Sequence, residues 1–169
     1  ICKKENKMTE TNINLGADFT EIENEAKAWV YTSNQDFTET QLLDIEKYSE
    51  VFLSQWDSHG KLVKGTIQIL HSRFIAIFAD TEDTMCGRAQ DSSLNFIKEL
   101  EQILEVKLMD RMLVAINHEG SIITLPFIEL RNKIAAGEIA KSTTFYNGLI
   151  ASKEQFLNDW ERPIEGSWI

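Results

Sequence analysis

Short hydrophobic runs alternate with longer stretches of helical period along most of this chain. The first run, residues 28–32, is rich in aromatic and β-branched side chains and predicts a β-strand. Residues 8–26 before it are polar and acidic with no sustained period, so we expect a mobile arm there. After it, Thr38 and Gln41 form a capping-box signature that predicts the start of an amphipathic helix ending near Trp56. The apolar positions of this helix are Leu42, Ile45, Tyr48, Val51 and Phe52.

The middle of the chain predicts a hairpin, a second helix and a buried strand. Two β-rich runs, 66–70 and 73–79, are separated by two residues. Asp91 is placed to cap a helix whose apolar residues form one stripe, and residues 112–116 follow as a strand. The order strand, helix, two strands, helix, strand predicts an α+β fold with a ferredoxin-like core. In such a core, a four-stranded antiparallel sheet carries two helices on one face.

Turn and helix signals continue beyond this core. The pattern predicts a hairpin turn at 117–120, a helix between Pro126 and Gly137, and a last short strand near 143–146. The tail is expected to start as a helix, to stop at Pro163, and then to lie along the surface of the body.

These elements divide the chain into three parts. We expect a flexible acidic N-terminal arm over 1–27, a ferredoxin-like core over 28–116, and an extension with an aromatic tail over 117–169 that packs on the core. Residues 1–7 precede Met8 and are interpreted as an upstream extension or an expression remnant.

The charge balance narrows the classes of function. The 169 residues carry 17 basic and 27 acidic side chains, a net charge of −10, which argues against binding to phosphate backbones. No apolar run approaches the roughly 18–20 residues of a membrane span. The two cysteines, Cys2 and Cys86, do not make a disulfide framework. We therefore expect a cytoplasmic protein without a membrane span, cofactor or nucleic-acid partner.

One stretch runs against the acidic balance. Residues 61–79 contain Lys61, Lys64 and Arg73 and no carboxylate. This basic strip is either a solvated sheet edge or a docking surface, and its occupant would then be an acidic partner or the chain's own residues 8–26.

Metal and nucleophile chemistry have weak signals. The three histidines lie in predicted loops without the clustered spacing of a zinc site, so we expect no metal. Cys86 is either an ordinary loop cysteine or a nucleophile near a helix N-terminus, and nothing in the sequence ties a histidine to it.

Other residues are candidates for binding a ligand or a partner. Trp56 and His59 combine an aromatic and a titratable group beside a glycine turn. Asp91 is a helix cap or a polar contact to a ligand, and Asp110 with Arg111 would either hold a polar ligand or close a loop as an ion pair. The candidate set is Trp56, His59, Arg73, Asp91, Asp110 and Arg111.

Four motifs give the chain a resemblance to a known family. They are Trp56-x-x-His59-Gly60, Asp91-x-Ser93, Asp110-Arg111, and Trp160-x-x-Pro163-x-x-x-Ser167-Trp168. With them, residues 28–168 resemble a family of small bacterial proteins that carry the automatic label "ABC transporter ATPase". The resemblance implies no catalytic residues. One departure is that family members place a cysteine where this chain has Arg88, whereas the cysteine here is Cys86.

The ATPase label can be tested against the sequence. A nucleotide hydrolase of that type needs G-x-x-x-x-G-K-[ST], because backbone N–H groups and a lysine must surround the phosphates. None of the eight glycines starts such a motif. The sequence therefore predicts no nucleotide hydrolysis.

The last third carries a second resemblance. Gly120, Pro126-Phe127, Glu129-Leu130 and the run from Ile134 to Ile139 are similar to the core of a GYF-like module. Such modules bind proline-rich peptides through exposed aromatics. The spacing from Pro126 to Gly137 is shorter here, and Met112-Leu113-Val114 replaces the expected aromatics. The resemblance thus implies the topology of the module without its peptide site.

Two hypotheses about function follow. The first is a non-enzymatic cytoplasmic module that binds another protein. The alternative is a small-molecule binder or enzyme with a pocket near Trp56, His59 and Asp91, which requires those side chains to converge on one cavity.

Overall fold

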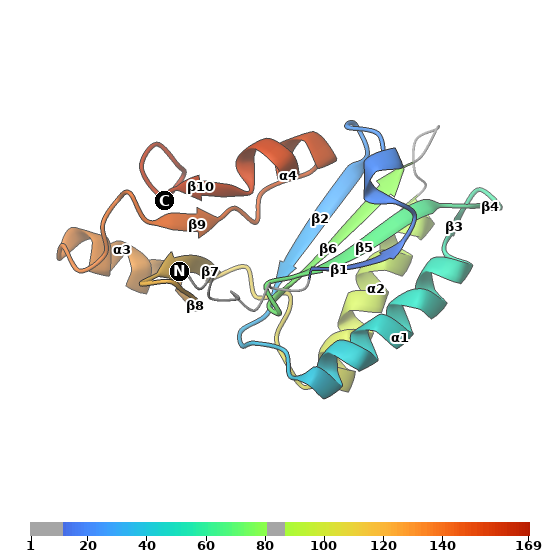
Figure 1. The fold of residues 1–169 in the computed structure, drawn as a ribbon, viewed down its shortest axis with the longest axis horizontal. Helices are drawn as coiled ribbons and strands as arrows, with labels where there is room; N and C mark the ends of the chain where they lie inside the picture. Colours follow the sequence, from blue (N-terminus) through green and yellow to red (C-terminus); the bar gives the residue numbers. More distant parts are fainter. Residues whose placement is uncertain (1–11, 81–86) are drawn as a thin grey trace, which may run out of the picture.

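Two four-stranded antiparallel sheets and four α-helices organise the part of the chain that the computed structural model describes, residues 12–80 and 87–169 (Figure 1). The protein is therefore of the mixed α+β class. The helices are α1 (Glu39–Gln55), α2 (Gly87–Leu104), α3 (Phe127–Ala135) and α4 (Lys153–Asp159), and a short 3-10 helix, η1, covers Phe19–Glu21. The strands are β1 (Ile13–Gly16), β2 (Lys27–Thr32), β3 (Asp57–Ser58), β4 (Lys61–Leu62), β5 (Lys64–Leu70), β6 (Phe74–Asp80), β7 (Leu113–His118), β8 (Ser121–Pro126), β9 (Thr144–Tyr146) and β10 (Glu161–Pro163).

The first sheet has the order β1-β5-β6-β2. Its edge strand β1 comes from the predicted mobile arm and pairs with β5, with Ile13 opposite Ile69. The expectation that order begins at residue 28 was therefore wrong for residues 13–26, and residues 1–11 lie outside the described part. Although this segment is mostly polar, its backbone is held in place by pairing with β5. Its two apolar residues, Ile13 and Leu15, also pack against the core.

The strand expected to complete the first sheet, at 112–116, belongs to the second sheet instead. That sheet has the order β10-β9-β7-β8. The physical reason lies in contacts between distant parts of the chain, since β7 pairs on one side with β9, where Ala115 lies opposite Tyr146. On its other side β7 is joined to β8 by a two-residue turn in which Glu119 and Gly120 both have positive φ, 53° and 82°. Such a turn commits the two strands to one hairpin. The expected boundary after residue 116 therefore falls inside β7.

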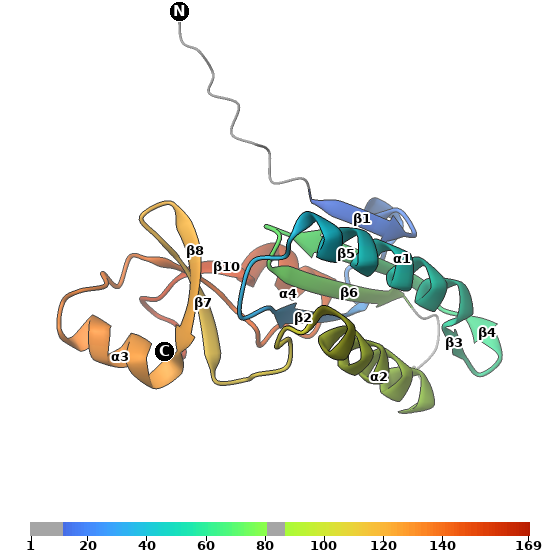
Figure 2. The same cartoon turned by 90° about the horizontal axis from the view of Figure 1, so that it is seen from below.

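The two faces of the first sheet pack against different partners. Residues such as Ile75 and Ile77 of β6 point toward α1 and α2, which cover one face (Figure 2). Their neighbours Phe74, Ala76 and Phe78 point the other way, into a cluster shared with β7, β9 and the C-terminal segment. Burial on both faces explains why β6 is continuously hydrophobic rather than alternating.

Helix α1 has the predicted start and end, whereas α2 starts earlier than predicted. Thr38 and Gln41 form the capping box in full, and α1 ends before Trp56. Helix α2 is already helical at Gly87, so Asp91 lies inside it and the prediction of Asp91 as a cap was wrong. The additional turn is stabilised by the complete burial of Ala89.

The C-terminal tail also differs from expectation. After α4 the chain forms β10, so Pro163 lies in an edge strand paired with β9 rather than at the end of a helix. Trp160 and Ile164 are buried, at 5% and 4% exposure, and anchor the tail to the core, whereas the other residues of 161–169 are exposed or half-buried along the body. Among residues 12–80 and 87–169, no helix has the length and apolarity needed to cross a membrane.

Candidate functional site

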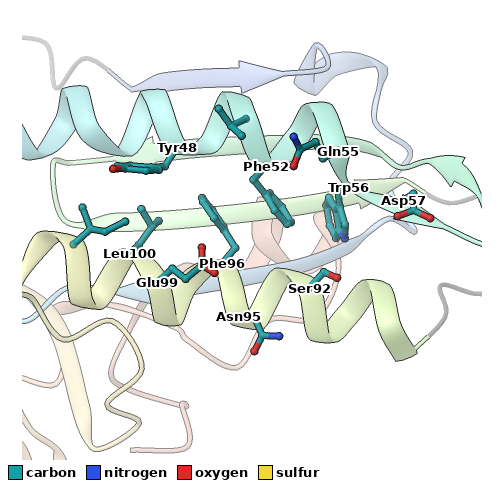
Figure 3. A pocket seen from close by; sticks show the side chains of 12 residues that line it. Tyr48, Phe52, Gln55, Trp56, Asp57, Ser92, Asn95, Phe96, Glu99 and Leu100 are labelled. Atoms are coloured by element: carbon teal, nitrogen blue, oxygen red, sulfur yellow. The ribbon is translucent and has the colours of Figure 1, made fainter.

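A groove of about 360 Å³ lies between α1 and α2 (Figure 3). Four aromatic residues line it: Tyr48, Phe52, Trp56 and Phe96. Polar side chains line it as well, namely Gln55, Asp57, Ser92, Asn95 and Glu99. The groove thus combines an apolar surface with hydrogen-bonding groups, which is the usual composition of a recognition site.

The aromatic side chains of the groove are held in place by their neighbours. Phe52 stacks on Phe96 with ring centroids 4.4 Å apart, and on its other side it contacts the Trp56 ring at 5.0 Å. Trp56 is 2% exposed, and its Nε1 donates a hydrogen bond to the Ala89 carbonyl at 2.8 Å. Because this bond joins the end of α1 to the start of α2, the groove has a fixed width at that end.

Gly65 allows Trp56 to pack closely on β5. A Cβ placed on Gly65 would lie 3.0 Å from Trp56 Cζ3 and 3.0 Å from a Leu53 methyl carbon. Real side chains rarely approach so closely, so the glycine positions the indole beneath the groove.

Apolar side chains are left exposed along the groove. Val51 is 51% exposed, Ile103 40% and Tyr48 38%, and all three line it. The sequence assigned Tyr48 and Val51 to the buried stripe of α1, and their place at an open groove was missed. The available signal was that the apolar stripe of α1, together with the neighbouring Leu43, is wider than one sheet face can cover.

Only one of the predicted site residues lines this groove. Trp56 does, while His59 lies exposed in the turn between β3 and β4, and Asp91 is exposed on α2. The structure therefore does not bring Trp56, His59 and Asp91 together around the groove.

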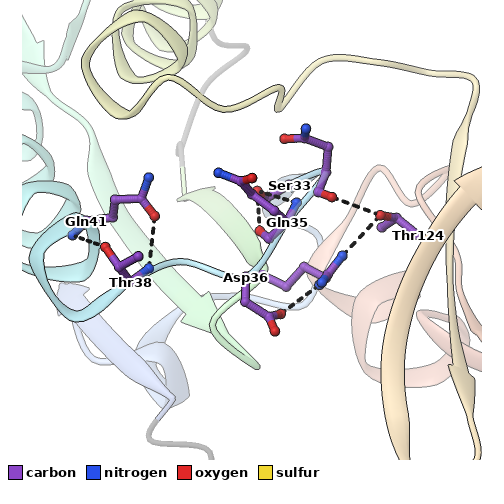
Figure 4. A network of polar contacts seen from close by, with 8 residues as sticks. Ser33, Gln35, Asp36, Thr38, Gln41 and Thr124 are labelled. Atoms are coloured by element: carbon purple, nitrogen blue, oxygen red, sulfur yellow. Dashed lines mark hydrogen bonds and ion pairs between the residues drawn. The ribbon is translucent and has the colours of Figure 1, made fainter.

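Arg73 is a structural residue at the junction of the two sheets, where it contacts Asp36 and Thr124, both labelled in Figure 4. It is 8% exposed; its Nε lies 2.9 Å from Asp36 Oδ1, and its guanidinium donates to Thr124 Oγ1 at 3.0 Å. Thr124 in turn donates to the Asn34 carbonyl at 3.2 Å. The network ties the loop after β2 to β8, which leaves Arg73 inaccessible to a partner.

The basic strip is accordingly not a continuous charged surface. Lys61 is exposed, but Lys64 Nζ donates to the Glu21 carbonyl at 3.1 Å. Of the occupants considered from the sequence, the chain's own N-terminal segment is the one that lies along β5, and it does so through strand pairing.

Replacing Arg73 with methionine is expected to lower the free energy of unfolding by about 1–3 kcal/mol, because Thr124 loses a charge-assisted hydrogen bond while Asp36 returns to water at little cost. Urea unfolding followed by tryptophan fluorescence measures the change. The exposed Arg88→Met variant serves as the control and should shift the midpoint little. Equal stability of the two variants would contradict the structural role of Arg73.

Asp110 and Arg111 act separately. Asp110 Oδ1 accepts a hydrogen bond from the Met112 N–H at 2.9 Å, which closes the loop locally. Within the described residues the two side chains form no ion pair with each other. Arg111 instead lies within electrostatic reach of Tyr31: burial raises the pKa of the Tyr31 hydroxyl, and the guanidinium partly opposes that rise.

The cysteine and histidine side chains considered as nucleophiles or metal ligands form no such site within the described residues. Cys2 and Cys86 lie outside the described residues. His71 packs against Trp160 and lies 3.6 Å from Glu161, so it belongs to the contact between the two sheets. In the described ranges, no three His, Cys, Asp or Glu side chains are grouped so that they could hold a metal ion.

No family model matches this chain, and no curated protein or solved structure matches it either.

Proposed function

We propose that this protein is a non-enzymatic interaction module that binds another protein in the groove between α1 and α2. The observation that carries the proposal is the row of exposed apolar side chains, Tyr48, Val51 and Ile103, beside a fixed aromatic surface. Exposed apolar surface next to a concave site is typical of protein–protein contacts.

The small-molecule alternative has less support. It needs Trp56, His59 and Asp91 around one cavity, and of these only Trp56 lines the groove in the described part of the chain. Trp56 is itself a core residue whose indole N–H is already hydrogen-bonded. A ligand could therefore contact little of it beyond the ring edge.

Four finer assignments belong to the same proposal. The segment β2-α1-β5-β6-α2, with strand neighbours β5-β6-β2, supports a relationship of the first half to ferredoxin-like folds. The order β8-α3-β9, preceded by β7, supports a GYF-like extension in the last third of the chain. The four motifs of the sequence support membership of the bacterial family labelled "ABC transporter ATPase", and the acidic composition supports a cytoplasmic partner protein.

The proposal is tested by comparing partners captured from a native lysate by three forms of the chain. The groove variant is Val51→Gln with Ile103→Gln, which removes apolar surface without changing charge. The matched control is Leu157→Gln with Ile128→Gln, at positions 55% and 63% exposed on α4 and α3. We expect one stoichiometric partner with the wild type and the control, and at least about a tenfold loss with the groove variant, roughly 1.4 kcal/mol.

Circular dichroism of each variant establishes that it is folded. Capture of no stoichiometric partner by the wild type, or equal capture by all three forms, would overturn the proposal.

A further inference from the structure

Carboxylates outnumber cations on the two helices that form the groove, although Lys47 Nζ lies 5.6 Å from the centre of the Tyr48 ring. Helix α1 carries four carboxylates and one lysine, and α2 carries three carboxylates and two cations. The lining itself contains Asp57 and Glu99, both exposed. Among the residues that the structure describes, no lysine, arginine or histidine lines the groove. Its occupant therefore needs positive charge to complement the rim.

Along most of its length the groove offers an occupant no unpaired strand, since only Asp57 of the two-residue strand β3 lines it. Both walls are α-helices, in which interior N–H and C=O groups are bonded within the helix. A partner segment that docks here cannot be extended by strand addition and must satisfy its own backbone groups. A helix does so, and a helix placed over two others is a common packing arrangement.

The dimensions fit side chains rather than a whole helix. A volume of about 360 Å³ equals roughly twelve water volumes at ~30 Å³ each, enough for a few apolar side chains. From Tyr48 to Trp56 the groove follows α1 for about 12 Å at 1.5 Å per residue, or a little over two helical turns. Apolar residues of the occupant at positions i, i+4 and i+7 span such a length.

We infer that the occupant is a basic amphipathic helix of a partner protein. Its apolar face packs over the stacked rings of Phe52 and Phe96 and against Ile103, and its lysine or arginine side chains lie over Asp57 and Glu99. This inference rests on the proposed function and names the chemistry of the partner.

Three fluorescent peptides of eighteen residues, about five helical turns, test the inference by anisotropy. They share one leucine face and carry lysine, glutamine or glutamate at the flanking positions. For the wild-type protein we expect the lysine peptide to bind about 3- to 10-fold more tightly than the glutamine peptide and the glutamate peptide to bind more weakly still. Raising the salt concentration from about 0.05 M to about 0.5 M should remove most of that difference.

Protein variants assign the effect to the groove. Asp57→Asn with Glu99→Gln should lower affinity for the lysine peptide about 3- to 10-fold, whereas Glu25→Gln with Glu165→Gln, which removes two exposed charges elsewhere, should leave it unchanged. The Val51→Gln/Ile103→Gln variant should weaken all three peptides. Equal affinity for the three peptides, no binding of any, or no effect of the Asp57/Glu99 change would overturn the basic-helix inference. Lysate capture judges the proposed function separately, because that test does not depend on the partner's charge.

Discussion

Replacing Phe74 with alanine is expected to lower the free energy of unfolding by about 3–5 kcal/mol, among the largest effects that one substitution can have in this protein. Phe74 is 0% exposed at the start of β6, and its ring centroid lies 4.9 Å from that of Tyr146 and 5.1 Å from that of Trp160. It therefore fills the contact between the first sheet and the C-terminal segment. Removal of the ring leaves a cavity, and side chains from both the first sheet and the C-terminal segment surround that cavity.

Urea unfolding at constant temperature measures this loss. The control is Leu149→Ala, at a position 69% exposed, which should change stability by no more than about 0.5 kcal/mol. If Phe74→Ala were as stable as the control, the packing of the C-terminal segment on β6 would be refuted.

Replacing Lys153 with methionine is expected to cost about 2–4 kcal/mol. Lys153 is 5% exposed at the start of α4; its Nζ donates to the carbonyls of Phe19 at 2.7 Å and Ile22 at 2.6 Å, and lies 4.3 Å from the centre of the Phe19 ring. Methionine keeps the apolar length of the side chain. The loss therefore reports the ammonium group and the Ile22 carbonyl left unpaired, since the Phe19 carbonyl still accepts a hydrogen bond from the Ile22 N–H at 3.2 Å.

The same variant has a local consequence that a general loss of stability does not have. Because Lys153 holds η1 against α4, amide hydrogen exchange over residues 18–26 should accelerate more than exchange in β6. Lys98→Met, on the exposed face of α2, is the matched control and should alter neither quantity. Unchanged exchange over 18–26 would show that Lys153 does not anchor this segment.

The Asp18 carboxyl also helps to hold η1 in place beside α4. The pKa of the Asp18 carboxyl is lowered, chiefly because the Thr20 backbone N–H and hydroxyl donate hydrogen bonds to it, with a smaller effect of the Lys153 charge. Asp18 also caps η1. These contacts fix η1 where the sequence predicted a mobile segment.

The candidate groove could be predicted from the sequence only in part. The helical periods of α1 and α2 identified Phe52, Phe96 and Leu100 as apolar positions on inward stripes, and these do line the groove. The separation of the two helices was not predictable, since it depends on how each one sits on the sheet. Tyr48 and Ile45 follow the same period, yet one is 38% exposed and the other fully buried.

The candidate residues chosen for their chemistry illustrate the same limit. Arg73 was selected as part of a basic strip, and its partners Asp36 and Thr124 come from segments that only the tertiary structure brings to it. Asp91 was selected as a cap from its residue type, but the helix continues toward the N-terminus because Ala89 is buried and its carbonyl accepts a bond from Trp56.

The sequence by itself determined the features whose causes lie within a few residues: the capping box at Thr38, the β5–β6 and β7–β8 hairpins, the helix between Pro126 and Gly137, and the absence of a phosphate-binding loop motif. Only the tertiary structure decided that β1 completes the first sheet, that β7 joins the second, and that α1 and α2 leave a groove open between them. The physical reason is that strand pairing and helix docking depend on contacts between residues far apart in the chain. A local hydrophobic pattern identifies a face that must be covered, but it does not identify the element that covers it.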